Sequence, residues 1–383
     1  MTSALIIGGG IAGAATAMAL HKAGIQPTIY EAYPTGADDV GAFLTIMNNG
    51  VDALRAIDAD QTVIDNSFPA TAIEVYTGAG KKIGDRPMGN GPRTLTRATL
   101  YRVLHDEAAR RGIPIEHGKR LVSVTTNGQV TATFEDGTSA SADLLVGADG
   151  IHSTTRSLID PDAPGPRYGG LNIAYGYTRD ATAASPEAYR MIFGKNAFFG
   201  YTTAPDGETW WFARVPGAEL TEPPSGEDWR NRLVTLFEPD DTPAAEIVAA
   251  TKAPFASNAY DVPTTPNWHR TPMVLVGDAA HAASPAAGQG ASMALEDSVI
   301  LAQCVRDLPD LDQAFATYVR IRRARVERLV AASAEQGSNA TPGPVKRFIR
   351  DAILTKVRKP APESRAWLYD HHIEWSARIT PPS

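Results

Sequence analysis

Three glycines near the start of the chain have the spacing of a turn that binds phosphate. Gly8, Gly10 and Gly13 form the pattern G-x-G-x-x-G between the apolar run 4–7 and an alanine-rich segment with helical spacing. The first glycine allows a tight turn after a strand, the second lets the backbone approach a pyrophosphate, and the third lets the next helix pack closely. The amino end of that helix offers free N–H groups and a positive dipole end to phosphates. The pattern therefore predicts a dinucleotide site.

An acidic residue follows at the distance expected for recognition of a ribose. The segment 27–30 has the composition of a strand and ends in Glu31, which lies 18 residues after Gly13. In dinucleotide-binding folds, a carboxylate about 20 residues after the glycines binds the ribose hydroxyls of adenosine. A free ribose indicates FAD or NAD rather than NADP.

Two more buried strands lead into glycine and aspartate. Residues 142–147 precede Asp149, residues 273–276 precede Asp278, and the glycine-rich stretch 288–290 then begins a predicted helix. An acid at such a turn is a good acceptor for ribityl or ribose hydroxyls, although turn or helix capping is the simpler alternative. Amides at a helix start suit the negative charge that a reduced isoalloxazine gathers at its N1–O2 edge. One NAD-binding domain needs a single junction of this kind, so three junctions favour a cofactor bound at several places.

The pattern of elements predicts an α/β fold in which a Rossmann-like cofactor domain is interrupted by a second domain. Residues 1–165 would form the first part of the FAD-binding domain. Strand patterns rich in Tyr, Phe and Trp over 166–265 predict a mainly antiparallel sheet that binds substrate. Parallel-sheet texture returns over 266–340, the second part of the cofactor domain. Residues 341–383 are predicted to form a helical C-terminal segment, with a helix over 344–357.

Composition and charge exclude several classes of protein. The 383 residues are 43% hydrophobic and 21% charged, as in ordinary globular chains, and the net charge of −7 argues against nucleic acid as a partner. No apolar run approaches the about 18 residues of a membrane span. Cys304 is the single cysteine, which excludes an internal disulfide and a thiolate metal cluster, and no metal site is assigned. The amino end has no leader pattern, so we expect a cytoplasmic protein.

Taken together, the three junctions resemble the motifs of the class A FAD-dependent aromatic hydroxylases, flavoprotein monooxygenases of the para-hydroxybenzoate hydroxylase type. Residues 146–153 with Arg156 match the DG motif of that family, and residues 277–290 match its GD motif. A tyrosine–arginine signature follows at Tyr318, Arg322, Arg323 and Arg325. The resemblance covers essentially the whole chain and is greatest to single-component hydroxylases that act on polyketides and tetracyclines.

The resemblance implies a resident FAD, with NAD(P)H as a transient co-substrate and O₂ as the oxidant. A flavin C4a-hydroperoxide would hydroxylate an aromatic or enolic small molecule, and because the flavin carries this chemistry no catalytic side chain is assigned. Arg97 occupies the place of a family arginine that contacts the flavin. The family usually has an arginine after Glu31, where this chain has Ala32. The residues predicted to bind FAD are Gly8, Gly10, Ile11, Ala12, Gly13, Glu31, Arg97, Asp149, Asp278, Pro285, Gly288, Gln289, Gly290 and Ala291.

Aromatic residues of the second domain are the candidates for contact with substrate. Phe193, Phe199, Trp211, Phe212 and the loop residue Pro285 are predicted to line a roomy cavity between sheet and flavin, with plain core packing as the alternative for each aromatic residue. No basic pocket is evident over 166–260, so the strands suit a bulky neutral polycycle.

Two other functions share these motifs. One is an FAD-dependent reductase or dehydrogenase of a secondary metabolite on the same fold. The other is a flavin-fold protein that binds a ligand or confers resistance without turnover. The motifs also leave open NADH or NADPH as the reductant, and the oligomeric state.

Overall fold

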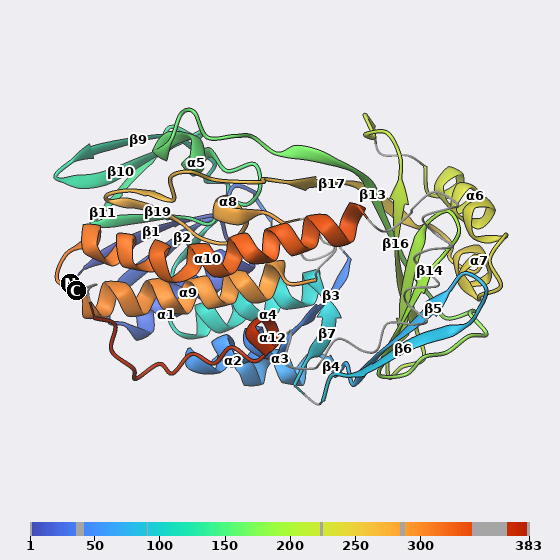
Figure 1. The fold of residues 1–383 in the computed structure, drawn as a ribbon. Coiled ribbons are helices and arrows are strands. Elements are labelled where there is room, and N and C mark those ends of the chain that lie inside the picture. Colours follow the sequence, from blue (N-terminus) through green and yellow to red (C-terminus); the bar gives the residue numbers. More distant parts are fainter. Residues whose placement is uncertain are drawn as a thin grey trace.

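Helices and a parallel sheet form one part of the molecule, and a large sheet covered by two helices forms the other (Figure 1). Both chain ends lie together at the end of the molecule away from the large sheet (Figure 1). This arrangement confirms the predicted α/β class with a mainly antiparallel second sheet. The computed structural model describes residues 2–35, 42–89, 91–222, 225–283, 288–338 and 366–380.

A six-stranded sheet carries the three glycine junctions. Its strands lie in the order β18 (His269–Arg270), β19 (Met273–Leu275), β12 (Leu144–Gly147), β1 (Ser3–Ile7), β2 (Gln26–Tyr30) and β8 (Ile115–Glu116). All neighbours are parallel except β18, which is antiparallel to β19. Ile7 pairs with Gly147, and Gly147 pairs with Leu275. Three strands far apart in the sequence therefore end at one level, and the loops that follow them are neighbours.

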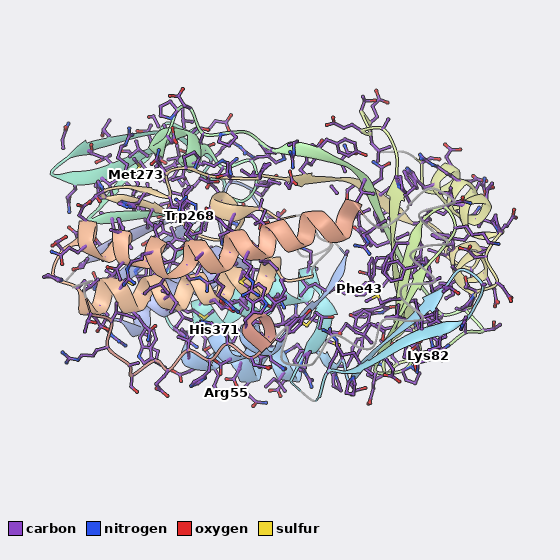
Figure 2. The ribbon with its side chains drawn as sticks, in the orientation of Figure 1. Phe43, Arg55, Lys82, Trp268, Met273 and His371 are labelled. Carbon is purple, nitrogen blue, oxygen red and sulfur yellow. The ribbon has the colours of Figure 1, made fainter. Side chains whose placement is uncertain are left out.

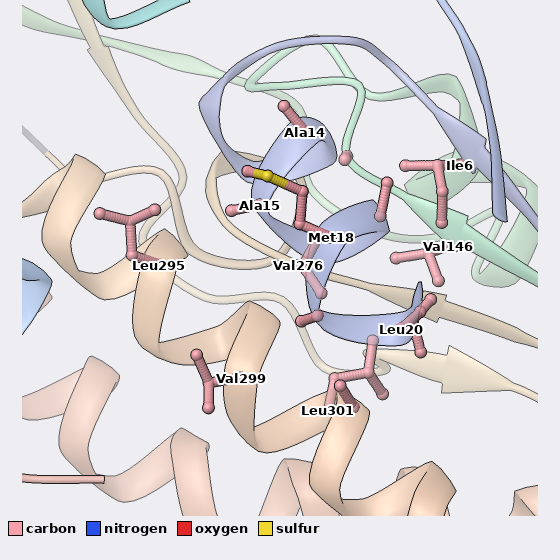
Figure 3. Close-up of a cluster of buried hydrophobic side chains, with 14 of the residues drawn as sticks. Ile6, Ala14, Ala15, Met18, Leu20, Val146, Val276, Leu295, Val299 and Leu301 are labelled. Carbon is pink, nitrogen blue, oxygen red and sulfur yellow. The ribbon is translucent and has the colours of Figure 1, made fainter. Parts of the chain in front are cut away.

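Helix α1 (Ile11–Lys22) is buried between this sheet and helix α9 (Gly290–Asp307). Its residues from Gly13 to Leu20 are all buried, as expected for a helix that is apolar on every side. Figure 3 shows Met18 and Leu20 of α1 packed between strand residues such as Val146 and the α9 residues Leu295 and Leu301. The alanines of α1 let the two helices approach closely, so the amino ends of both helices are held beside the sheet.

The second sheet has seven strands and combines two regions of the chain. Its order is β17 (Phe255–Asp261), β13 (Arg167–Thr178), β16 (Thr209–Pro216), β15 (Phe198–Thr203), β14 (Ala188–Phe193), β5 (Ala72–Thr77) and β6 (Lys82–Pro87). Neighbours are antiparallel except β14 and β5, which are parallel. The β5–β6 hairpin thus extends this sheet although the sequence analysis placed residues 72–87 in the first segment. Helices α6 (Gly226–Phe237) and α7 (Ala244–Ala249) pack on one face.

Two three-stranded sheets and several shorter helices complete the fold. One three-stranded sheet has the order β3 (Phe43–Ile46), β7 (Arg93–Thr96) and β4 (Phe68–Pro69), and another has β11 (Ser139–Ala142), β10 (Gln129–Phe134) and β9 (Leu121–Asn127). The remaining short or peripheral helices are α2 (Asn48–Ala56), α3 (Asp60–Asp65), α4 (Arg97–Arg110), α5 (Thr154–Ile159) and α8 (Asp278–His281). Sheet β3–β7–β4 matters most for the site, because β3 runs from the large sheet toward α2 and α9.

Helix α10 (Leu311–Ser338) lies along α9, and both lie across the parallel sheet (Figure 1). The short helix α12 (Ala366–Tyr369) packs near α2. The helix predicted over 344–357 lies outside the described residues. Within the ranges that the structure covers, no helix has the length and apolar composition to cross a membrane. In the same ranges, no group of three or more His, Cys, Asp or Glu residues could hold a metal ion.

Candidate functional site

The first glycine turn has the conformation and close contacts that its spacing predicted. Gly8 has φ of +99°, and a Cβ there would lie 2.5 Å from the carbonyl oxygen of Ala148. A Cβ on Gly13 would lie 1.9 Å from the carbonyl oxygen of Gly8. A Cβ on Gly10 would meet nothing within 4 Å. Two glycines are therefore required by the fold, whereas Gly10 borders open space at the amino end of α1, where a ligand phosphate has room to approach.

Glu31 fastens this turn from the end of β2. Its Oε2 accepts a hydrogen bond from the Gly9 amide at 2.6 Å, and its Oε1 accepts one from the Tyr33 amide at 3.0 Å. Only 8% of the residue is exposed. On α4, His105 contacts the carbonyl of Gly9, a neighbour that no motif indicated. The structure thus assigns Glu31 a part in shaping the turn, and its contact with a ribose stays a prediction.

At the second junction, Asp149 is held by its own turn. Its Oδ2 accepts hydrogen bonds from the amide and the hydroxyl of Thr155 at 2.9 and 3.0 Å, and its Oδ1 accepts one from Ser153. Burial raises the pKa of Asp149, although these hydrogen bonds act in the opposite direction. The capping alternative therefore describes its protein contacts, and contact with FAD stays a prediction.

Arg156 joins the second junction to the third. Its guanidinium donates to the carbonyl of Ala279 at 3.1 Å and to that of Ile151 at 2.6 Å. Only 3% of the residue is exposed. The arginine that ends the DG motif therefore fixes the spacing between this motif and α8 of the GD motif.

The third junction meets the first turn directly. Gly277 has φ of +58°, and a Cβ there would lie 3.0 Å from Cβ of Ala12 and 3.2 Å from Cβ of Ala294. Asp278 is the first residue of α8 and has an exposed side chain. The start of α1, the GD turn and the body of α9 therefore converge, with an unburied carboxylate beside them.

The amino end of α9 lies at the same place. Gly288 has φ of +61°, Gln289 precedes the helix, and Gly290 and Ala291 form its first turn. The nearest atom to a Cβ on Gly290 would be Oδ1 of Asp278, at 3.9 Å. The free amides of this first turn therefore lie close to Asp278, and a helix start of this kind suits an anionic edge. Pro285, assigned to both the cofactor and the substrate site, lies outside the described residues.

A buried ionic network holds α9 against α10. Arg322 donates to Asp297 at 2.7 Å and also contacts Glu296, and all three side chains have no exposed surface. Burial alone would raise the pKa of Asp297, but its interactions with His281 and Arg322 outweigh burial and hold that pKa well below its usual range. The pKa of Glu296 is likewise lowered, since Arg322 and Arg325 overcome the effect of burial. The acids are therefore ionised and serve as anchors.

The anchored acids in turn hold the third junction. Asp297 Oδ2 accepts the Gly277 amide at 3.0 Å and lies 2.5 Å from Nε2 of His281. Tyr318 donates to the carbonyl of Leu275 at 3.1 Å. The tyrosine–arginine signature on α10 thus supports the GD turn from behind, and His281 is a packed neighbour of that turn, 6% exposed.

Asn49 of α2 links this network to the residue before α9. Its Nδ2 donates to Oε1 of Glu296 at 2.6 Å and to Oε1 of Gln289 at 3.2 Å. Within the described ranges, Oδ1 of Asn49 and Nε2 of Gln289 are buried without a hydrogen-bond partner. The pyrimidine edge of an isoalloxazine carries both a donor N–H and acceptor carbonyls, which complements one unpaired acceptor and one unpaired donor. The residues present therefore fit the predicted FAD.

Replacement of Asn49 with Ala tests this link. We expect the free energy of unfolding to fall by about 1–3 kcal/mol, because Glu296 and Gln289 lose a buried donor. We also expect the Kd for FAD to rise about fivefold, the equivalent of one hydrogen bond of about 1 kcal/mol. Denaturant unfolding and quenching of FAD fluorescence measure the two effects.

Asn66→Ala is the matched control, because Asn66 is exposed and its side chain bonds, among the described residues, only the carbonyl of Thr62 in the helix just before it, at 2.9 Å. This control is expected to stay within about 0.5 kcal/mol of the parent protein. An Asn49→Ala protein with unchanged stability and FAD affinity would show that the link has no role.

Arg97 is positioned by the cap of α4. Thr96 accepts the Thr99 amide at 3.0 Å, and the Arg97 amide donates to the Ala42 carbonyl at 3.0 Å. The Arg97 side chain is exposed, and no hydrogen bond or ion pair of its guanidinium occurs within the described ranges. Its contact with the flavin remains a prediction.

The seven-stranded sheet presents an aromatic face to the part that carries the glycine turns. The ring of Phe43 on β3 lies 5.6 to 6.3 Å from the rings of Tyr177, Tyr189, Trp210 and Phe212. Figure 2 shows Phe43 at the junction of the two parts. We call this surface the front face; it is the side of the sheet opposite α6 and α7.

Hydrogen bonds fix the distance between the front face and β3. The hydroxyl of Tyr189 accepts from Thr45 at 2.8 Å and lies 3.0 Å from the hydroxyl of Thr94. Burial raises the pKa of Tyr189 to about 12, so the phenol is neutral at ordinary pH. β3 then leads to Met47, whose amide donates to Ser292 of α9 at 3.1 Å. The sheet is thereby tied to the amino end of α9.

The four aromatic residues predicted to contact substrate lie on two different faces. Phe212 lies on the front face. Phe193 lies there too, because its ring is 5.1 Å from that of Phe198, which in turn lies beside Phe212. Phe199 and Trp211 have no exposed surface and pack in the core beneath α6 and α7. Because side chains alternate along a strand, neighbours in sequence point to opposite sides. Phe199 and Trp211 therefore pack the core, and Trp210 joins Phe212 on the front face.

Several known proteins are similar to this chain in sequence or in fold. Residues 1–333 match the protein family described as FAD binding domain. The chain is 30% identical over 354 residues to an aurachin C monooxygenase/isomerase of Stigmatella aurantiaca, covering 86% of this chain and 87% of the relative. It is 30% identical over 384 residues to the 3-amino-4-hydroxybenzoate 2-monooxygenase PtmB3 of Streptomyces platensis, covering 95% and 94%. The crystal structure of Klebsiella pneumoniae HpxO complexed with FAD and uric acid superposes with a TM-score of 0.85 at 26% identity, covering 95% and 94%.

Proposed function

We propose that this chain, which belongs to the FAD-binding-domain family, hydroxylates an aromatic or enolic small molecule with NAD(P)H and O₂. It is an FAD-dependent enzyme of the monooxygenase class, as its relatives are. The observation that supports this proposal is the convergence of three glycine junctions with the amino end of α9, where Asn49 and Gln289 carry buried polar atoms that have no partner among the described residues.

We assign the residues of the site by the part of the cofactor that each suits. Gly10 and the start of α1 would hold the pyrophosphate, and Glu31 would lie at the adenosine end. Asp278 would accept hydroxyls of the ribityl chain. The first turn of α9, with Gln289, would hold the anionic edge of the isoalloxazine, because free amides and a positive dipole end favour negative charge there. Residues 1–165 and 266–340 would thus bind FAD, and the sheet over 166–265 would face the substrate.

The chain's own residues position the reactants and exclude water. When bound, FAD would supply the redox chemistry, with NAD(P)H as the reductant and O₂ as the oxidant, so that one oxygen atom enters the substrate and the other leaves as water. The front face, with Phe212 and Phe193, would cover the substrate ring and keep water away from the reacting carbon. The network of Arg322 with Asp297 holds the GD turn rigid, so that the ring-binding amides are fixed before substrate arrives.

One experiment separates this proposal from its alternatives. Purified protein is loaded with FAD and mixed with NADH or NADPH and isotope-labelled O₂, using 3-amino-4-hydroxybenzoate, urate and quinolone compounds as probes. We expect faster oxidation of the reduced pyridine nucleotide with one probe and incorporation of one labelled oxygen atom into its product. Oxidation that ends entirely in hydrogen peroxide, or in a reduced probe without label, would instead indicate a reductase. Protein that takes up no FAD would contradict both enzymatic functions.

A further inference from the structure

The last described segment of the chain, residues 366–380, is bonded to both α9 and α2. We call it the C-terminal strap. Gln303 of α9 donates to the carbonyl of Glu374 at 2.9 Å. Asp52 of α2 accepts the amide of Ile373 at 2.8 Å. Two helices that carry residues of the cofactor site therefore fix the path of the strap.

The first residues of the strap share an arginine with the buried ionic network. Arg325 of α10 donates to the carbonyl of Leu368 at 3.0 Å and contacts that of Trp367. The same guanidinium donates twice to Glu296, from Nε to Oε2 and from Nη2 to Oε1, both at 2.8 Å. The Arg325 side chain is 13% exposed, and that of Glu296 has no exposed surface. Arg325 is therefore a second cation on Glu296, beside Arg322, and the strap holds it in place.

Packing of the strap reinforces the position of Arg325. The ring centroid of Trp367 lies 5.7 Å from the central carbon of Arg325 and 3.9 Å from that of Arg328. Leu368 is buried in the main core. A long arginine side chain has many rotamers in water, so the carbonyls and the ring of the strap favour the rotamer that reaches Glu296.

Glu296 carries this arrangement to the start of α9. Its Oε1 accepts Nδ2 of Asn49 at 2.6 Å, and that amide also donates to Oε1 of Gln289 at 3.2 Å. Asn49, Gln289 and Glu296 are at most 1% exposed. Water does not replace a lost charge or hydrogen bond at such a place, so a change at one member affects the next. Gln289 precedes the turn at which the anionic edge of the isoalloxazine is proposed.

The charge of Glu296 matters most when the flavin is reduced. Reduction places negative charge at the edge that the start of α9 is proposed to hold, and a nearby buried carboxylate disfavours that charge. Arg322 and Arg325 offset the carboxylate of Glu296. With Arg325 drawn away, Arg322 would be left to offset both Glu296 and Asp297.

We propose that the C-terminal strap is a positioning element of the flavin site: it holds Arg325 on Glu296 and so keeps the isoalloxazine edge favourable to the negative charge of reduction. This inference rests on the proposed function, because it requires the isoalloxazine at the start of α9. Arg325 is the positioning residue through which the strap acts, and it needs no contact with FAD. Residues 366–380, predicted only as part of a helical C-terminal segment, thereby gain a role in cofactor chemistry.

The midpoint potential of bound FAD tests the proposal. In Arg325→Met, reduced FAD should bind about tenfold more weakly relative to oxidised FAD, which lowers the two-electron midpoint potential by about 30 mV. Arg325→Lys should lose less, because lysine keeps the charge but not the planar set of donors. Trp367→Ala should shift the potential in the same direction, since the strap then holds Arg325 less firmly. Reductive titration of each FAD-loaded variant against a reference dye measures the potential.

A double variant shows whether the strap acts through this arginine. In the Arg325→Met background, Trp367→Ala should change the potential no further, because the connection that it disturbs is already absent. Equal shifts by Trp367→Ala with and without Arg325 would contradict the proposal, as would an Arg325→Met protein with the potential of the parent. If Arg325→Met binds too little FAD for titration, Arg325→Lys takes its place, and the shift caused by Trp367→Ala should then be smaller than in the parent protein.

Two controls separate this role from a general loss of stability. Arg328→Met makes the same substitution beside the same tryptophan, but Arg328 is exposed, and among the described residues no bond joins it to Glu296. Gln303→Leu frees the strap at its far end and should lower the Tm. Both controls should keep the potential of the parent protein, and a control that lowers it as far as Arg325→Met does would overturn the proposal. Since no oxygen transfer is measured, such a result would leave the proposed monooxygenase reaction standing.

Discussion

Replacement of Arg322 with Met is expected to lower the free energy of unfolding by about 3–5 kcal/mol at neutral pH. Arg322 is the shared partner of Asp297 and Glu296, and none of the three side chains has exposed surface. Methionine fills the volume of Arg322 but carries no charge. The two buried carboxylates then lose the cation that offsets the free-energy cost of removing them from water. The loss therefore comes from uncompensated charge and not from a cavity.

The size of this loss depends on pH. In the parent protein the pKa values of Asp297 and Glu296 are lowered. Their stabilising contribution is therefore fully present above the pKa values of the unfolded chain, about 4, and is lost only as the pH falls further through the folded values. In Arg322→Met the buried carboxyls gain stability by taking up protons. The difference between variant and parent should shrink as the pH falls from 7 toward 5.

Two measurements follow this change. Denaturant unfolding at several pH values reports the free energy, and labelling of Cys304 on α9 reports local opening. Cys304 has no exposed surface, and burial raises its pKa to about 12, so the native thiol should react very slowly. Labelling should accelerate in Arg322→Met. The control Arg323→Met removes a partly exposed neighbour on the same helix and should cost less than about 1 kcal/mol. Equal stability of the two variants would show that the network is not an anchor.

The glycine junctions could be predicted because they depend on local geometry. The turn at Gly8, the close approach at Gly13 and the left-handed φ of Gly277 follow from residues a few positions apart. The return of a parallel sheet after residue 266 follows from the same strand-to-glycine pattern repeated three times, whereas the order of β19, β12 and β1 is known from the structure. The hairpin β5–β6 could not be placed in this way, since its pairing with β14 joins residues more than one hundred positions apart.

The ionic and hydrogen-bond partners of the site residues could not be predicted, because spacing along the sequence does not reveal contacts between distant elements. The signature Tyr318 and Arg322 was visible, but its acids Glu296 and Asp297 looked like the polar face of an ordinary helix. Their burial arises because α1, α2 and α10 all pack around α9.

The faces of the large sheet were ambiguous for a related reason. Both sides of β16 carry aromatic residues, so alternation separated Trp211 from Phe212 without showing which one α6 and α7 would cover. An arginine in such a strand, as at Arg214, has the pattern of a solvent-facing residue. Only the three-dimensional packing shows that it is buried.

The second large effect concerns binding and leaves folding intact. Replacement of Gly10 with Val is expected to raise the Kd for FAD by about a hundredfold, or about 3 kcal/mol, because a side chain would occupy the space that a pyrophosphate needs. Gly10 has φ of −64°, which any residue adopts, and a Cβ there meets nothing within 4 Å. The apoprotein should lose no more than about 1 kcal/mol, the usual cost of a poor residue before a helix.

Comparison with two other glycines makes this expectation specific to the cofactor. Gly165 is exposed, has no atom near its missing Cβ and lies outside the site, so Gly165→Val should change neither FAD affinity nor stability. Gly13→Ala would place a Cβ 1.9 Å from the Gly8 carbonyl and should unfold the turn itself. Fluorescence titration of each apoprotein with FAD, beside its thermal unfolding, distinguishes the three cases. If Gly10→Val folds and still binds FAD as the parent does, the pyrophosphate lies elsewhere. If Gly10→Val folds normally but binds FAD weakly, the open space at Gly10 is required for FAD binding.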